Sequence, residues 1–294
     1  MTSALTFPAP LRLSRRLADA PPATFFVGSA VFHYLGPAFA VLLFARIDPL
    51  GVTWLRIVSA ALIFAAWRRP WRRFAALERE RRTLLAMGAV LAAMNATFYV
   101  AIDHLPLGTV AAIEFLPVIG LAALGVRTPR NALALGLAVT GVYVLTDVQL
   151  EGEPVGVAFA FVNAALFALY IVLAHRISQS PALGRIDGLA ASMLIAAVAV
   201  TPIGVWSAAP ALVDPVALAA GIGVGITSSV IPYVCDQLAM ARLSRAAYSL
   251  MVALLPATAT IVGIVVLAQI PSAAELGGVA LVVAAVATHR ERSR

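Results

Sequence analysis

The chain has 294 residues, of which 62% are hydrophobic and 12% are charged, and its net charge is +7 at neutral pH. A water-soluble domain is about 45–50% apolar and about 25% charged, so this composition excludes a single water-soluble core and indicates a membrane protein that crosses the bilayer several times. The single cysteine, Cys235, excludes an internal disulfide and a metal cluster held by cysteines.

Ten apolar stretches, several of them short, are candidates for transmembrane helices, which need about 17–25 residues each. In chain order they are 24–45, 51–67, 83–102, 109–126, 131–146, 155–174, 188–206, 216–239, 247–267 and 274–288. The connections between them are brief and leave no room for a water-soluble catalytic domain. Residues 1–22 carry arginines but no apolar stretch of their own, so no cleavable signal peptide is expected. The sequence therefore predicts an all-α integral membrane protein with ten transmembrane helices.

The arginines predict the orientation of these helices. If the N-terminus is cytoplasmic, the cytoplasmic segments hold 19 of the 21 basic residues, and the opposite loops hold only Arg46. The opposite loops carry acidic residues instead: Asp48, Asp103, Asp147, Glu151, Glu153, Asp214 and Glu275. Basic residues gather on the cytoplasmic side of membrane proteins, so both termini are expected in the cytoplasm. The basic run at 68–82 is accordingly expected to anchor the chain at the membrane and not to bind nucleic acid.

The two halves of the chain resemble each other loosely. AIDHLPLGTVAAIEFLPVIGLAALG in the first half corresponds to LAMARLSRAAYSLMVALLPATATIVG in the second, and Pro117 matches Pro256 with a one-residue offset. Five helices per half, an odd number, place the halves in opposite orientations. An inverted repeat with proline-interrupted helices at matching positions is typical of a transporter whose site lies at the repeat interface, around a central cavity. The expected divisions are a cytoplasmic tail at 1–22, a first repeat at 23–150, a second repeat at 151–289 and a tail at 290–294.

Polar side chains interrupt several apolar spans. A carboxylate such as that of Glu114 costs about 2.5–3.5 kcal/mol inside a membrane span on insertion scales, so it calls for a partner or a function. Asn95 and Tyr99 are four residues apart and share one helix face. The residues predicted to bind substrate are His33, Asn95, Tyr99, Glu114, Ser229, Tyr233 and Asp236.

Prolines lie beside these polar residues. A proline inside a helix lacks the N–H that would bond the carbonyl four residues earlier. Such a break is tolerated at membrane depth only where protein or a water-filled cavity covers it. The freed carbonyls and the nearby hydroxyl and amide groups together suit the ammonium and the carboxylate of a small zwitterion. The expected helix breaks or gating positions are Pro37, Pro117, Pro232 and Pro256, of which the first three free the carbonyls of His33, Ile113 and Ser228.

Each polar residue also has a structural interpretation. Asn95 is equally consistent with a hydrogen bond to a neighbouring helix, the tyrosines with core or interfacial aromatics, and His33 with a satisfied interior histidine. For Glu114 the structural alternative is an ion pair with Arg56 or a hydrogen bond to a neighbouring helix. Arg56 itself is a candidate to extend outward to the membrane surface. Asp236 lies near the cytoplasmic end of its span, where a charge costs less.

Four segments carry a resemblance to a known family: GVTWLRI (51–57), AAMNATFYVAIDHLPLGTVAAIEFLPV (92–118), GVAFAFVNAALFALYIVLAHR (156–176) and SSVIPYVCDQLAMARLS (228–244). They resemble the drug/metabolite transporter superfamily, and its ten-helix EamA-type branch, which includes threonine/homoserine and aromatic amino-acid exporters, fits best. The resemblance implies two inverted five-helix repeats, a central cavity lined by the hairpins at 88–121 and 216–267, and export of amino acids across the bacterial inner membrane.

The resemblance also bears on single residues. Asn95, Tyr99, Glu114, Tyr233 and Asp236 match positions where these exporters carry polar or aromatic residues. Two positions depart from the pattern. Ala268 and Gln269 stand where the family usually has Gly-Glu, so any role of that acid is expected to be absent, and Ala253 lacks the acid that Glu114 supplies in the first half.

The motifs of enzymes and of ATP-driven pumps do not occur: there is no G-x-x-x-x-G-K-[ST], H-E-x-x-H or G-x-S-x-G. We therefore expect no enzyme, no catalytic residues, no cofactor and no metal. The expected function is an amino-acid exporter that works by alternating access and is broad for small neutral and aromatic amino acids (threonine/homoserine, methionine, phenylalanine-like). The substrate gradient or protons would drive it, with Glu114 and His33 as proton-carrying candidates. The alternative is export of other small metabolites or of cationic drugs. One chain holds both halves, so a monomer suffices, and a dimer is also compatible.

Overall fold

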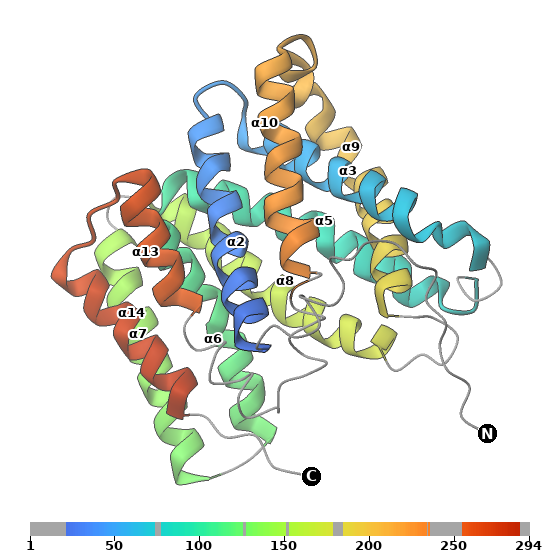
Figure 1. The fold of residues 1–294 in the computed structure, drawn as a ribbon. Helices are drawn as coiled ribbons and strands as arrows, with labels where there is room; N and C mark the ends of the chain where they lie inside the picture. Colours follow the sequence, from blue (N-terminus) through green and yellow to red (C-terminus); the bar gives the residue numbers. More distant parts are fainter. Residues whose placement is uncertain are drawn as a thin grey trace.

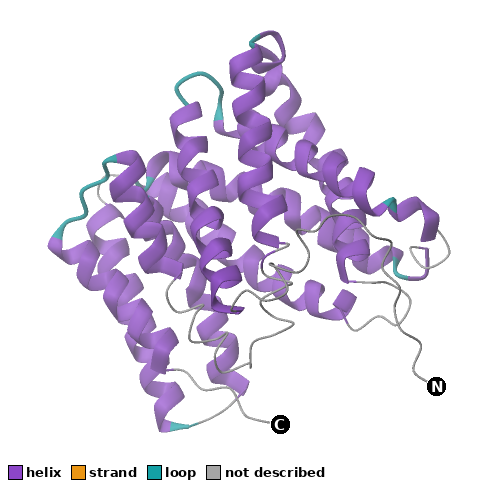
Figure 2. Ribbon diagram, in the orientation of Figure 1, coloured by secondary structure: helices purple, strands orange, loops and turns teal. Residues whose placement is uncertain are grey.

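The computed structural model describes residues 22–73, 78–125, 128–150, 153–178, 185–233, 235 and 255–288, and the regular structure of these residues is helical (Figure 1 and Figure 2). The ten α-helices are α2 (Pro22–Leu43), α3 (Pro49–Arg68), α5 (Arg81–His104), α6 (Leu107–Gly125), α7 (Pro129–Leu150), α8 (Pro154–Ser178), α9 (Arg185–Val213), α10 (Pro215–Gly225), α13 (Leu255–Leu267) and α14 (Ala273–Thr288). A 3₁₀ turn, η1 (Pro70–Arg73), follows α3, and a π-helical turn, η2 (Ile226–Val230), continues α10. These helices confirm the ten predicted spans in order; the end of the eighth span and the start of the ninth lie outside the described residues.

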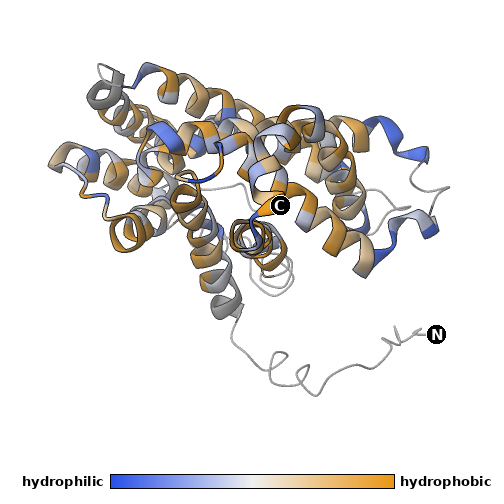
Figure 3. Cartoon of the chain, turned by 90° about the horizontal axis from the view of Figure 1, so that it is seen from above, coloured by the Kyte–Doolittle hydropathy of each residue, from blue (hydrophilic) through white to orange (hydrophobic). Residues whose placement is uncertain are grey.

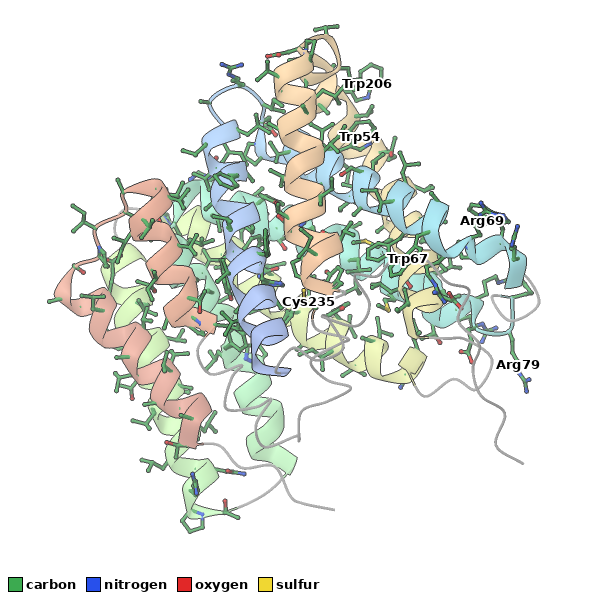
Figure 4. All side chains as sticks on the ribbon, in the orientation of Figure 1. Trp54, Trp67, Arg69, Arg79, Trp206 and Cys235 are labelled. Carbon is green, nitrogen blue, oxygen red and sulfur yellow. The ribbon has the colours of Figure 1, made fainter. Side chains whose placement is uncertain are left out.

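The helices have the lengths and surfaces of membrane spans. Five are long and apolar enough to cross a bilayer, namely Pro49–Arg68, Arg81–His104, Pro154–Ala174, Ile186–Val213 and Pro215–Tyr233. Hydrophobic residues run along most of the helices, and hydrophilic residues concentrate near several helix ends (Figure 3). Arg69 and Arg79 lie on the side where α3 ends, whereas Trp206 lies near the start of α3 (Figure 4). The chain is therefore an all-α, multi-pass membrane protein.

Two helices begin with the same Asp-Pro pair. Asp48 precedes α3 and Asp214 precedes α10, and each carboxylate accepts a hydrogen bond of 2.9 Å from the backbone N–H two residues ahead. The proline occupies the first turn, where a missing N–H is tolerated. The backbone N–H groups of Ala217 and then Val216 hold the pKa of Asp214 below its usual value. This cap therefore stabilises α10 above the usual carboxyl pKa, and its contribution is lost as the pH falls through the lowered value.

The two halves pack in a repeated pattern. Helix α3 contacts α9, α6 contacts α13 and α7 contacts α14, so that each pair joins helices holding the same place in the two halves. Helix α5 packs against α8 and α9, and correspondingly α10 with η2 packs against α2 and α3. The contact of α2 with α13 is matched by that of α6 with α8. The halves therefore interdigitate, and the surface between them runs through the centre of the molecule. The predicted boundary at 150/151 falls between α7 and α8 and stays a prediction.

Ion pairs at helix ends also join the two halves. Arg46, between α2 and α3, pairs with Asp214 at 3.3 Å. At the other end of α3, Arg68 pairs with Asp187 in the first turn of α9 at 2.8 Å. The exposed Arg46 pair contributes little stability, because water and salt screen the attraction between exposed charges. The pair of Arg68 with the buried Asp187 carboxylate is the stronger of these two links.

Glycines allow the matched helices to approach closely. At the α7–α14 contact, a Cβ on Gly278 would lie 2.9 Å from the carbonyl oxygen of Gly141 and 2.6 Å from the side chain of Leu145. A Cβ on the preceding residue, Gly277, would have nothing within 4 Å. Small residues at such contacts are the usual means of close helix packing in membranes.

We expect Gly278→Ala to lower the free energy of unfolding by about 1–3 kcal/mol, because the added methyl group overpacks the α7–α14 contact. The neighbouring Gly277→Ala variant is the matched control and should be neutral or stabilising by up to about 1 kcal/mol, because alanine favours a helix over glycine. Thermal unfolding of the detergent-solubilised variants measures both effects. Equal midpoints for the two variants would contradict the close approach of α7 and α14.

Candidate functional site

Buried polar side chains from both halves gather inside the helix bundle. They come from α3, α5, α6, α8 and η2, in the middle of otherwise apolar segments. The exposed fraction of each side chain is below a tenth: Arg56 5%, Asn95 3%, Glu114 7%, Asn163 0%, Ser228 0% and Ser229 0%. Polar groups in such a place are costly unless they are hydrogen-bonded.

Arg56 of α3 binds the π-helical turn η2. Its Nε donates a hydrogen bond to the Ser229 hydroxyl at 3.0 Å, and its Nη2 donates to the backbone carbonyl of Ser228 at 3.1 Å. This carbonyl is the one that Pro232 leaves without a helical donor. The acceptor predicted from Pro232 is thus present, and a guanidinium occupies it. The alternative that Arg56 extends outward to the membrane surface is wrong, because the residue is buried.

The carboxylate of Glu114 in α6 meets α8 of the other half. Asn163 Nδ2 donates a hydrogen bond to Glu114 Oε1 at 3.2 Å. Of the two structural alternatives for Glu114, the hydrogen bond to a neighbouring helix is present, and none of the described ion pairs joins Glu114 to Arg56. Sequence reasoning missed Asn163, although an amide inside the apolar run FVNAALF is the same signal that singled out Asn95.

Asn95 and Tyr99 share a buried face of α5, as predicted, but they differ in their contacts. Asn95 Nδ2 donates to the carbonyl of Leu91, one turn earlier in its own helix, at 2.7 Å. The Tyr99 ring is packed edge-on against Phe44 and lies under the guanidinium of Arg56, whose carbon is 5.3 Å from the ring centre. The Asn95 side chain thus bonds within its own helix, whereas the Tyr99 ring contacts Arg56.

Helix α2, which holds His33 and Pro37, packs against η2. Ser29 donates a hydrogen bond to the carbonyl of Pro232 at 3.3 Å. A Cβ on Gly36 would overlap Ser228, so the two segments touch at their backbones. His33 is half-buried, with its ring edge-on to that of Tyr34 at 5.4 Å. The α2 break region therefore lies against the segment that Arg56 holds.

The structure places the predicted prolines and Tyr233 in helices or directly after η2. Pro37 and Pro117 lie inside α2 and α6, and Pro232 follows η2. Tyr233 is half-buried beside Pro232. Pro256 is the second residue of α13, and the carbonyl that it would free lies outside the described residues, as do Asp236 and Ala253. The role of all these residues in substrate binding remains a prediction.

The segment before the last helix holds an unexpected contact. Ala268 has a left-handed backbone conformation with φ 53°. The neighbouring Gln269 accepts a hydrogen bond at its Oε1 from the backbone N–H of Leu107, at the start of α6, at 3.2 Å. First-turn N–H groups have no partner within their own helix. A neutral amide oxygen therefore satisfies this N–H in this chain, at the position where the family usually has an acid.

A cavity of about 430 Å³ lies between α2 and α10, apart from the buried polar residues. It is lined by Phe39, Leu42, Leu43, Arg46, Val216, Ala217, Ala220, Gly223, Val224 and Thr227. Figure 1 shows α2 and α10 side by side at this place. The hairpins expected to line a cavity, 88–121 and 216–267, contribute only α10 and the start of η2 to it.

Comparison with known proteins agrees with this architecture. Residues 154–288 match the EamA-like transporter family. The threonine/homoserine exporter RhtA of Escherichia coli (strain K12) is 31% identical over 254 residues, which cover 85% of this chain and 84% of RhtA. RhtA of Salmonella typhimurium (strain LT2) gives the same identity and coverage. A solved structure, titled "Crystal structure of protein", has a TM-score of 0.58 and 18% identity over 92% of this chain and 96% of that one, and so supports the fold alone.

The identity to these transporters runs through both halves and agrees with the ten helices observed. With such relatives over 85% of its length and a family match over its second half, the chain belongs to the EamA-like transporter family of the drug/metabolite transporter superfamily.

Proposed function

We propose that this protein is an inner-membrane exporter of amino acids that works by alternating access, with both termini in the cytoplasm. The relatives named as threonine/homoserine exporters support this class of substrate. The observation that carries the proposal is that buried polar contacts join the two halves. Arg56 of the first half binds Ser228 and Ser229 of the second. Glu114 of the first half likewise accepts from Asn163 of the second.

These contacts are the ones that must change if the halves move relative to each other. A hydrogen bond within one half survives such a movement, whereas a bond between the halves is broken. Breaking the contacts of Arg56 and Glu114 without replacement would leave two buried charges unsatisfied, which is expensive in a membrane. A substrate with its own charged groups supplies the replacement, so the halves separate most readily when substrate is present.

The surroundings of Glu114 suit an amino acid with an apolar or aromatic side chain. Its carboxylate is an acceptor for an ammonium group. Beside it, Phe115 lies edge-on to Phe167 with ring centres 6.2 Å apart, and Phe167 stacks on Tyr170 at 6.2 Å. Phe167 follows Asn163 by one helical turn, so it lies on the same face of α8. This row of aromatic rings favours the proposed range of substrates, which are small neutral and aromatic amino acids.

The same observation favours one alternative, an exporter of cationic drugs or of other small cationic metabolites. A carboxylate beside stacked aromatic rings attracts organic cations as well as ammonium groups. The two functions differ in the need for a carboxylate on the substrate. Quaternary ammonium dyes have none, so they distinguish the two functions in competition with amino acids.

The proposed driving force is the substrate gradient or the proton gradient. Glu114 and His33 are the proposed proton carriers, because both can change charge and both lie within the helix bundle. Gradient-driven transport should lose its pH dependence in Glu114→Gln or in His33→Ala. Full pH dependence in both variants would remove these residues as carriers.

Uptake into liposomes holding the purified protein is the first test of the proposed function. We expect saturable uptake of labelled threonine, methionine and phenylalanine, with each amino acid competing against the others and quaternary ammonium dyes competing poorly. An imposed pH gradient separates proton coupling from facilitated diffusion. Uptake no higher than that of empty liposomes, with folded protein, would reject the amino-acid function.

Glu114→Gln should reduce threonine uptake about tenfold or more, because a neutral amide no longer balances the ammonium group of the substrate. The matched control is Glu153→Gln, which removes a carboxylate from an exposed contact with His104 at 3.2 Å. The control should keep the uptake of the wild-type protein. A Glu114→Gln variant with undiminished uptake would show that Glu114 is structural.

A further inference from the structure

Arg56 carries a buried positive charge that forms no ion pair with an acidic side chain of the described residues. The ion pairs in the described part of the chain use Arg46, Arg68, Arg81 and His104 as the cations, and all of these lie at or near helix ends. Arg56 lies about two turns inside α3 and has only neutral hydrogen-bond acceptors. A buried ion without a counter-ion is unfavourable. A neutral donor would satisfy the same carbonyl, so the need for a donor alone does not explain a charged residue at this position.

Two residues that contact Arg56 carry buried hydroxyl groups without hydrogen-bond partners among the described residues. They are Tyr99 Oη and Ser228 Oγ. Both belong to residues in contact with Arg56, one through the face of its ring and the other through its backbone carbonyl. Buried polar groups in proteins are nearly always hydrogen-bonded, so two such hydroxyls on residues that contact one buried cation indicate a place for a ligand.

We propose that Arg56, Tyr99 and Ser228 bind the carboxylate of the transported amino acid, an inference that rests on the proposed function and names the substrate group at its site. A carboxylate offers two oxygens with about four acceptor positions. The planar guanidinium of arginine matches these two oxygens with parallel N–H donors. The hydroxyls of Tyr99 and Ser228 supply the further donors.

The position of Glu114 gives the bound amino acid a direction. Arg56 and Glu114 have opposite charges, yet each is hydrogen-bonded to neutral groups of the second half. A zwitterion can satisfy both, with its carboxylate toward α3 and η2 and its ammonium group toward α6 and α8. A carboxylate is a stronger acceptor for a guanidinium than a carbonyl or a hydroxyl group. Its binding thus replaces the direct bonds from Arg56 to the Ser228 carbonyl and the Ser229 hydroxyl, so that the bound carboxylate, and no longer Arg56 itself, links α3 to η2.

The test compares ligands with and without a carboxylate on the full-length protein and its variants. The ligand pair is L-threonine and L-threoninamide, and the readouts are uptake into liposomes and ligand-induced shifts in thermal unfolding. The wild-type protein should prefer threonine about tenfold or more, and Arg56→Gln should abolish this preference. Tyr99→Phe, which removes only a hydroxyl with no partner among the described residues, should reduce the preference about threefold. The exposed Arg79→Gln is the matched control and should keep the full preference.

The outcomes separate this inference from the proposed function. If the wild-type protein transports threonine and folded Arg56→Gln keeps the full preference for it, the carboxylate site is wrong and the exporter function stands. If the wild-type protein transports no amino acid, the thermal shift with propionate against propionamide decides: a shift with propionate alone that needs Arg56 supports the site, and equal shifts overturn it. If Arg56→Gln does not fold, Tyr99→Phe decides, and an unchanged preference overturns the inference.

Discussion

One backbone carbonyl connects the helix geometry of this protein to its buried charges. Pro232 cannot donate to the carbonyl of Ser228, and an unbonded carbonyl within a membrane is costly. Arg56 supplies the missing donor, which brings a positive charge into the bundle and ties α3 to η2. Gly36 has no side chain, so α2 can approach the same turn closely. The contact between the halves therefore depends on a bond that a competing acceptor can replace.

The two halves share their packing, but only one of them supplies the charged residues of the candidate site. The same set of helix contacts recurs when each helix is exchanged for its counterpart. Within the candidate site, the charged residues Arg56 and Glu114 both belong to the first half, whereas Asn163, Ser228 and Ser229 of the second half are neutral. In the proposed transport cycle, the substrate takes the place of these neutral groups, and the second half then moves away from the two charged residues. The sequence has the same inequality, because Ala253 stands where the first half has Glu114.

The sequence predicted the helices well because length and hydropathy decide which segments cross a membrane. It also located the free carbonyl at Ser228, because the effect of a proline is local. What binds that carbonyl was not predictable, since Arg56 and Ser228 are 172 residues apart and only packing brings them together. The position of Arg56 near the start of a span suggested an outward-facing side chain instead. Asn163 was predictable, because an amide interrupts an apolar segment of the sequence. Nothing in the sequence distinguishes the residues that line the cavity between α2 and α10 from ordinary apolar packing.

The most direct test of this account is a structure of the protein determined with L-threonine bound. The account predicts the carboxylate of threonine on the guanidinium of Arg56, the ammonium group on Glu114, and a Ser228 carbonyl no longer bonded to Arg56. The opposite result is threonine bound elsewhere, for example between α2 and α10, while Arg56 still donates to Ser228 and Ser229. That structure would make the buried arginine a purely structural link between the halves.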